Sequence, residues 1–180
     1  MRATGDGAAR RRPTSRTAWR PWRHAERSIP SACIVGASYG SYAAVAGVTL
    51  QQGLYRCTVG LGPVTDLKMM YQTILQESGN MVTMGRSLRE QLGDPKGYDA
   101  VSPRRFAAKA DAPILLIHGK DDTDVSFRQS QAMANALKDA KKHYELVPLA
   151  GEDHWLSREE TRKRMLAETV RFVQKYNSAD

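Results

Sequence analysis

The segment Gly36-Ala37-Ser38-Tyr39-Gly40 constrains the fold of this chain more than any other, because it fits the pattern G-x-S-x-G. It directly follows the apolar, β-branched run at 33–35, and a stretch of small residues with helical character comes after it. Strand, sharp turn and helix is the context in which this pattern forms a nucleophile elbow, with the serine exposed. Small residues at Gly36 and Gly40 leave room for the close approach of strand and helix. The pattern alone also fits an ordinary turn with a solvated hydroxyl.

A nucleophilic serine needs a base, and the base needs an acid that orients it, in the chain order Ser, Asp, His. The run 113–117 is typical of a buried parallel strand, and it leads into a cluster of three acids, Asp121, Asp122 and Asp124. A second predicted strand, 144–149, leads into the loop that contains His154. Reactive groups of open α/β sheets gather at the carboxyl ends of the strands. Of the four histidines, only His154 combines this order with a loop position.

With these residues the chain resembles the catalytic domain of the prolyl oligopeptidase family of serine peptidases. The resemblance runs from about residue 32 to residue 176, and it is specific because several separate blocks occur in the right order. The blocks are Ile34-Val35-Gly36-Ala37-Ser38-Tyr39-Gly40 with Tyr42-Ala43-Ala44, then Ser102-Pro103, then Ala112-Pro113-Ile114-Leu115-Leu116-Ile117-His118-Gly119 with Asp122, Val125 and Gln129-Ser130, and finally Gly151-Glu152-Asp153-His154.

The resemblance implies acyl transfer to a serine, with a peptide as substrate. Ser38 would be the nucleophile, His154 the general base, and the backbone N–H of Tyr39 one donor to the oxyanion. The family's acid stands three residues before the valine of the block H-G-x-x-D-x-x-V, which is Asp122 here. Fold and triad do not fix the leaving group, so an esterase or thioesterase stays an alternative, as does a catalytically inactive fragment.

Two residues depart from the family pattern. Ser41 stands where many members have a second glycine after the elbow, which should only crowd the start of the helix. Asp124 stands where some members have an arginine that holds a substrate carbonyl. A carboxylate cannot donate that hydrogen bond, so the substrate preference of those members does not transfer.

The predicted fold class is α/β, the C-terminal portion of a mostly parallel, doubly wound α/β-hydrolase sheet over residues 31–180. Sheets of this class normally have several strands before the elbow strand, but nothing before residue 32 has a strand pattern. In the resembled peptidases that upstream half also supplies a tyrosine hydroxyl to the oxyanion. We therefore expect an isolated chain with little or no activity, whose elbow strand pairs with a missing N-terminal half or with another copy.

The formal net charge of +8 is concentrated at the start of the chain. Residues 1–28 hold eight arginines against Asp6 and Glu26, which leaves about +2 for the rest. We weigh three interpretations of segment 1–30: a disordered basic tail, an Arg-rich and acid-poor presequence, and a non-native start read from a shifted frame. The charge is not spread over the predicted fold, so we do not expect a nucleic-acid partner.

Other classes of partner and cofactor find no support in the sequence. No apolar run approaches the 18 or so residues of a membrane span, and no Cys/His cluster has zinc spacing. We expect no metal and no cofactor. Cys33 and Cys57 fall in two adjacent predicted strands, the second at 55–59, and we expect buried, reduced thiols. No feature identifies the compartment, and a cytoplasmic location is favoured.

Helix starts and a buried stripe are also predicted from the pattern. Ser126 with Gln129, and Ser157 with Glu160, have the spacing of a capping box before helix 127–138 and before the last helix. The last helix should bury Leu166, Val170 and Val173. Between residues 64 and 111, short helices carry four methionines, which either line a pocket or, as we favour, pack internally: Met69, Met70, Met81 and Met84.

Overall fold

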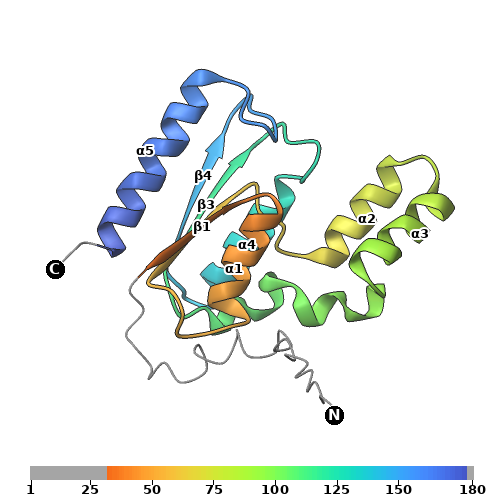
Figure 1. Cartoon of the computed structure of the whole chain (residues 1–180), viewed down its shortest axis with the longest axis horizontal. Helices are drawn as coiled ribbons and strands as arrows, with labels where there is room; N and C mark the ends of the chain where they lie inside the picture. Colours follow the sequence, from red (N-terminus) through yellow and green to blue (C-terminus); the bar gives the residue numbers. More distant parts are fainter. Residues whose placement is uncertain (1–31, 178–180) are drawn as a thin grey trace, which may run out of the picture.

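A parallel four-stranded sheet organises the computed structural model, which describes residues 32–177 (Figure 1). The strands are β1 (Cys33–Ala37), β2 (Cys57–Leu61), β3 (Ile114–Gly119) and β4 (Tyr144–Leu149), and they lie in that order. Every neighbouring pair is parallel, so all four carboxyl ends lie at one edge of the sheet. The predicted α/β class is confirmed. The predictions about segment 1–30 lie outside the residues that the structure describes.

Helices cover both faces of this sheet. On one face, α1 (Tyr39–Thr49) and α4 (Arg128–Asp139) bury Val45, Val48, Met133 and Leu137 against Ile114 and Leu116. On the other face, Phe172 of α5 (Glu159–Tyr176) packs among residues of β2, β3 and β4. All six residues of β3 are buried, because this strand has a strand on each side and helices on both faces. Such burial explains its unbroken apolar run.

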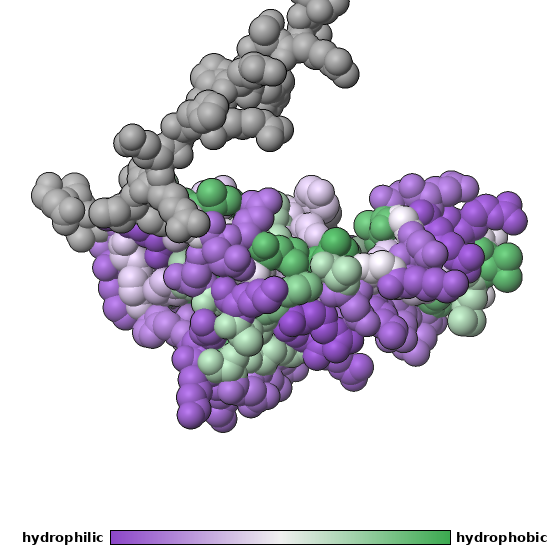
Figure 2. Space-filling view, turned by 90° about the horizontal axis from the view of Figure 1, so that it is seen from below, coloured by the Kyte–Doolittle hydropathy of each residue, from purple (hydrophilic) through white to green (hydrophobic). Residues whose placement is uncertain are grey.

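The segment between β2 and β3 forms a helical lobe that projects from the sheet (Figure 1). The lobe consists of α2 (Leu67–Glu77), α3 (Met81–Leu92) and the 3₁₀ helix η2 (Pro95–Val101). The next 3₁₀ helix, η3 (Pro103–Lys109), packs back against α1 and α4, with Ala107 in the core. The surface of the lobe is mostly hydrophilic with small apolar patches (Figure 2), and Met81 and Val82 at the start of α3 are 63% and 77% exposed.

Asp66 ties this lobe to the loop after β2. Its carboxylate caps α2 by accepting from the Met69 N–H at 2.9 Å, and it pairs with Arg104 at 2.5 Å. Burial alone would raise the pKa of Asp66, but the hydrogen bonds from Met69 and Arg104 lower it below its usual value. The start of α2 is therefore fixed by a charged hydrogen-bond network.

Both predicted capping boxes are wrong. The side chain of Gln129 turns away from its helix, accepts from the Thr65 and Asp66 N–H groups and donates to the Asp66 carbonyl. The Ser157 hydroxyl donates to Asp153 at 2.6 Å instead of capping α5. The partner of Gln129 lies in the loop after β2 and that of Ser157 in the loop before α5, and in both places this bond has replaced the capping bond.

The predicted buried stripe of α5 is also wrong at two of its three positions. Leu166 and Val170 are 57% and 51% exposed. The helix instead buries Phe172 and packs Met165 and Val173 beside it. Both sets have helical spacing, so periodicity alone could not choose the face that meets the sheet.

The two cysteines are joined, which corrects the prediction of reduced thiols. Cys33 and Cys57 face each other directly in the β1–β2 register and form a disulfide. The predicted adjacency of the two strands is right, although β2 begins at Cys57 rather than at Tyr55. The Tyr55 ring packs on Gly47 of α1 instead. The disulfide closes a loop that contains α1 and the turn before it.

Candidate active site

Ser38 occupies the turn between β1 and α1 with a backbone φ of +51°. This left-handed conformation is strained for a residue with a side chain, and such strain gathers at functional sites. The Ser38 N–H donates to the Leu61 carbonyl at 2.9 Å, which fixes the turn to the end of β2. A Cβ on Gly36 would overlap the Gly40 carbonyl, whereas a Cβ on Gly40 would meet nothing within 4 Å. Only Gly36 is required by the close approach.

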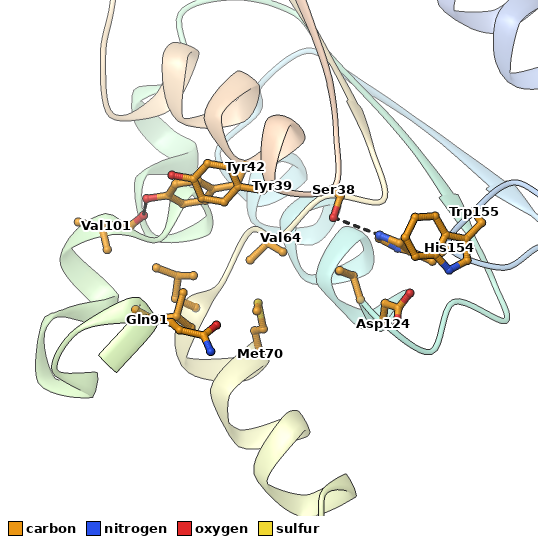
Figure 3. Close-up of a pocket in the computed structure, with 13 residues that line it drawn as sticks. Ser38, Tyr39, Tyr42, Val64, Met70, Gln91, Val101, Asp124, His154 and Trp155 are labelled. Atoms are coloured by element: carbon orange, nitrogen blue, oxygen red, sulfur yellow. Dashed lines mark hydrogen bonds between the residues drawn. The ribbon is translucent and has the colours of Figure 1, made fainter. Parts of the chain in front are cut away.

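The structure brings Ser38, His154 and Asp122 into one chain of hydrogen bonds. His154 Nε2 lies 3.1 Å from Ser38 Oγ (Figure 3), and His154 Nδ1 lies 2.8 Å from Asp122 Oδ2. In the neutral histidine, Nδ1 donates to the carboxylate and Nε2 accepts from the serine hydroxyl. Asp121 and Asp124 are both exposed, and neither carboxylate takes part in this chain.

Four donors converge on the Asp122 carboxylate. Oδ1 accepts from the N–H groups of Asp124 and Val125 at 3.0 and 2.8 Å, and Oδ2 accepts from His118 and His154. Burial alone would raise the pKa of Asp122, but the hydrogen bonds from His118, Val125 and His154 together lower it to about 2. Asp122 is therefore an anion throughout the neutral range.

His118 is a residue of this site whose part the sequence did not reveal. Its Nε2 lies 3.1 Å from Asp122 Oδ2 and 2.8 Å from the Val125 carbonyl oxygen, so Nε2 must carry the proton. Its Nδ1 accepts from the Ser130 hydroxyl at 2.7 Å. The sequence holds His118 and Ser130 in the family blocks, but it gives no indication that the imidazole lies against Asp122.

Glu152 joins the loop of His154 to the loop of Asp122. Its fully buried carboxylate accepts from the Asp153 N–H at 3.0 Å and from Thr161, and its carbonyl accepts from the Asp121 N–H at 3.0 Å. A Cβ on Gly119 would overlap the Glu152 carbonyl. Glycine at this position therefore allows the two loops to touch.

The Tyr39 N–H points out of the first turn of α1. Tyr39 is the first residue of the helix, and the N–H groups of a first turn have no intrahelical acceptor. The positive end of the helix dipole adds to the attraction for a negative oxygen beside Ser38. No group of three or more potential metal ligands occurs among residues 32–177.

A cavity of about 570 Å³ opens beside Ser38 and His154 (Figure 3). Its wall consists mainly of apolar side chains from the helical lobe and α1, including Val64, Leu67, Met70, Leu92, Val101 and Tyr42. Of the four methionines considered above, Met70 lines the cavity and Met81 faces solvent. The four methionines therefore neither all line a pocket nor all pack internally. Asp124 and Trp155 complete the wall on the side of His154.

The parallel sheet and the arrangement of Ser38, Asp122 and His154 define the class of protein. A serine on a strained strand-to-helix turn, followed in the chain by an aspartate and a histidine at the ends of later parallel strands, is typical of α/β hydrolases. The profile of the prolyl oligopeptidase family matches residues 28–179. The chain belongs to this family.

Curated relatives extend far beyond the matched region. Dipeptidyl aminopeptidase BIII of Pseudoxanthomonas mexicana is 25% identical over 78% of this chain and 21% of its own length. A probable chloroplastic glutamyl endopeptidase of Arabidopsis thaliana is 41% identical over 44% of this chain and 8% of its own length. The chain thus spans about a fifth or less of these relatives.

Solved structures agree in fold. An acylaminoacyl peptidase in complex with a chloromethyl ketone superposes with a TM-score of 0.70 at 22% identity, over 81% of this chain and 24% of the peptidase. A puromycin-hydrolyzing peptidase of Mycobacterium tuberculosis gives 0.68 at 23% identity, over 81% and 22%. Within residues 32–177, no helix is both long and apolar enough to cross a bilayer.

Proposed function

We propose that this chain carries the reaction centre of a serine-type peptidase that cleaves peptide bonds through an acyl-enzyme. The observation that carries the proposal is the hydrogen-bond chain from Ser38 through His154 to Asp122, on a strained turn beside an apolar cavity. Membership of a family of serine peptidases supports the same reaction.

In the first half of the reaction, Ser38 Oγ attacks the substrate carbonyl carbon while His154 Nε2 takes its proton. The carbonyl oxygen becomes an oxyanion, and the Tyr39 N–H donates to it. His154 then returns the proton to the leaving amine as the C–N bond breaks. In the second half, His154 takes a proton from water, the resulting hydroxide attacks the acyl ester, and the proton returns to Ser38.

Asp122 stabilises the imidazolium that forms on His154 in each half. Because its pKa is about 2, it stays ionised and does not take the proton itself. His118 acts through Asp122: its Nε2–H bond to Oδ2 orients the carboxylate toward His154. Removal of one oxyanion-hole donor of the kind proposed for the Tyr39 N–H costs about 3–4 kcal/mol in well-studied hydrolases.

A chain that holds these groups without turning over substrate is the second candidate, and one observation favours it. Among the described strands, β1 has a neighbour on one side only, and Val35 in it is 48% exposed. The strand that carries Ser38 is therefore less supported than β3, which lies between two strands.

A fluorophosphonate probe separates the candidates, because it reacts only with an activated serine. If the first candidate is right, the full chain is labelled at Ser38, as located by peptide mass spectrometry, and Ser38→Ala stays unlabelled. Labelling at another serine would contradict the assignment, and absence of labelling in a folded chain would favour the inactive candidate. Matched amide and ester substrates then distinguish a peptidase from an esterase or thioesterase.

A further inference from the structure

Asp124 presents an unpartnered carboxylate to the cavity beside the proposed nucleophile. It is exposed and lines the same cavity as Ser38 and His154 (Figure 3). Among residues 32–177, no side chain or N–H group forms a hydrogen bond or ion pair with its carboxylate oxygens, whereas the carboxylates of Asp122 and Asp153 each accept several hydrogen bonds. Its charge is free to meet a ligand.

The backbone under this carboxylate is held firmly. The Asp124 N–H donates to Asp122 Oδ1 at 3.0 Å, and the next N–H, of Val125, donates to the same oxygen at 2.8 Å. The Val125 carbonyl accepts from His118 at 2.8 Å. Asp124 is therefore fixed to the loop that supplies the proposed acid, at a constant place relative to His154.

Among the described residues that line the cavity, none besides Asp124 is a carboxylate and none is a permanent cation. The side chains that face Asp124 across the cavity are apolar or neutral, including Val64, Met70, Val101, Tyr42 and Gln91. A ligand that fills this space loses water from around Asp124, and an opposite charge placed there interacts more strongly than it would on an open surface.

We propose that Asp124 determines specificity by favouring peptides that carry a cationic group close to the bond that Ser38 attacks. The group is the ammonium or guanidinium of a Lys or Arg side chain, or a free amino terminus. This inference rests on the proposed function, and it names the substrate class. Because the carboxylate is partly solvated, we expect roughly a threefold to tenfold preference over a neutral analogue.

Equilibrium binding tests this preference without any need for turnover. Full-length Ser38→Ala is titrated with N-acetylated peptide amides that differ at one position, Lys or norleucine, before a constant Leu, and with the norleucine peptide bearing a free amino terminus. We expect the cationic peptides to bind three to ten times more tightly, and less so in 0.5 M salt. If only one kind of cationic peptide binds more tightly, that peptide shows whether the preference is for a basic side chain or for a free amino terminus.

Matched variants identify the residue responsible. Asp124→Asn, in the Ser38→Ala background, should remove the preference, while Asp121→Asn should keep it, because Asp121 is also an exposed carboxylate but lies outside the cavity. Equal denaturation midpoints show that both variants fold. A cationic preference that is absent from the parent, or unchanged by Asp124→Asn, overturns the inference, as does a lack of binding by every peptide at millimolar concentration.

Fluorophosphonate labelling keeps the two proposals apart, because the probe is neutral and small. In the chain with Ser38 and Asp124 both intact, labelling reports on Ser38 without any contribution from a cationic group of the probe. A binding preference without labelling would reject the proposed function and leave the role of Asp124. Labelling without a binding preference would support the proposed function and reject the role of Asp124.

Discussion

At the residue scale, the depressed pKa of Asp122 links the site to stability at low pH. A carboxylate with a pKa of about 2 in the folded chain, against an ordinary value of 3.8, stabilises the fold above pH 4. This contribution is lost as the pH falls from about 4 to 2, because the unfolded chain takes up the proton first.

We expect the denaturation midpoint of the parent chain to approach that of Asp122→Asn across this pH range. The two midpoints should differ most above pH 4, where the parent carboxylate is ionised and hydrogen-bonded. The measurement is urea denaturation from pH 2 to pH 6, followed by circular dichroism. A difference that stays constant down to pH 2 would show that the charge of Asp122 contributes nothing.

Substitution of the three neighbouring acids tests which one serves His154. Asp122→Asn should slow labelling of Ser38 by roughly 10⁴-fold, since it removes the charge and the tautomer control that orient the histidine. Asp121→Asn and Asp124→Asn should stay within a few-fold with a neutral probe. A larger loss at Asp121 or Asp124 would transfer the role to that residue.

The sequence predicts the three residues of the hydrogen-bond chain better than it predicts the residues that hold them in place. The G-x-S-x-G motif selects Ser38, chain order and loop position select His154, and resemblance to the family's H-G-x-x-D-x-x-V block selects Asp122. His118 and Glu152 are different: the His118 ring contacts Asp122 across the turn that follows β3, and the Glu152 backbone carbonyl accepts from Asp121 in a loop that is distant in sequence. No local pattern specifies such a contact, and the catalytic roles themselves stay predictions.

At the element scale, the elbow depends on one glycine rather than two. Gly36→Ala should destabilise the chain strongly, by about 3 kcal/mol or more, since its Cβ would overlap the Gly40 carbonyl and the backbone would have to move. Gly40→Ala should be neutral or stabilise by up to about 1 kcal/mol, because it meets open space in the first turn of a helix. The measurement compares the denaturation midpoints of the two variants with that of the parent chain. An equal loss of stability in both variants would contradict the expected difference.

The free edge of β1 should govern association of the chain. Val35 is 48% exposed on a strand with one described neighbour, which favours pairing with another chain. We expect Val35→Lys to increase the monomer fraction in sedimentation velocity, because a lysine on an edge strand opposes pairing. Val35→Thr is the uncharged control and should behave like the parent. Identical behaviour of all three proteins would rule out this edge.

Elements surrounded on both faces are the ones that the sequence predicts accurately. The apolar run of β3 leaves no alternative to a central strand, and β4 has the predicted bounds. The face of α5 and the starts of α4 and α5 are predicted poorly. There Gln129 binds the loop after β2 and Ser157 binds Asp153 in the loop before α5. The packing of α5 on β2 and β3 selects Phe172 over Leu166.

At the scale of the whole molecule, the disulfide should contribute about 3 kcal/mol to stability, because Cys33 and Cys57 are separated by 24 residues. Dithiothreitol should therefore lower the unfolding free energy of the parent chain by about this amount. The double variant Cys33→Ala with Cys57→Ala should not respond to dithiothreitol. If two free thiols titrate in the folded chain without added reductant, the cysteines are reduced, as the sequence analysis predicts.

The contact between Glu152 and the loop after β3 couples the two loops that carry Asp122 and His154. The Asp121 N–H donates to the Glu152 carbonyl, and the Lys120 N–H donates to the Leu149 carbonyl, so the ends of β3 and β4 are joined directly. Asp122 and His154 belong to these coupled loops, whereas Ser38 is fastened to β2 through Leu61. We therefore expect a chimera that takes the ends of both β3 and β4 from one homologue to keep the contact between Asp122 and His154, and the contact that it must restore is the 3.1 Å hydrogen bond between His154 and Ser38.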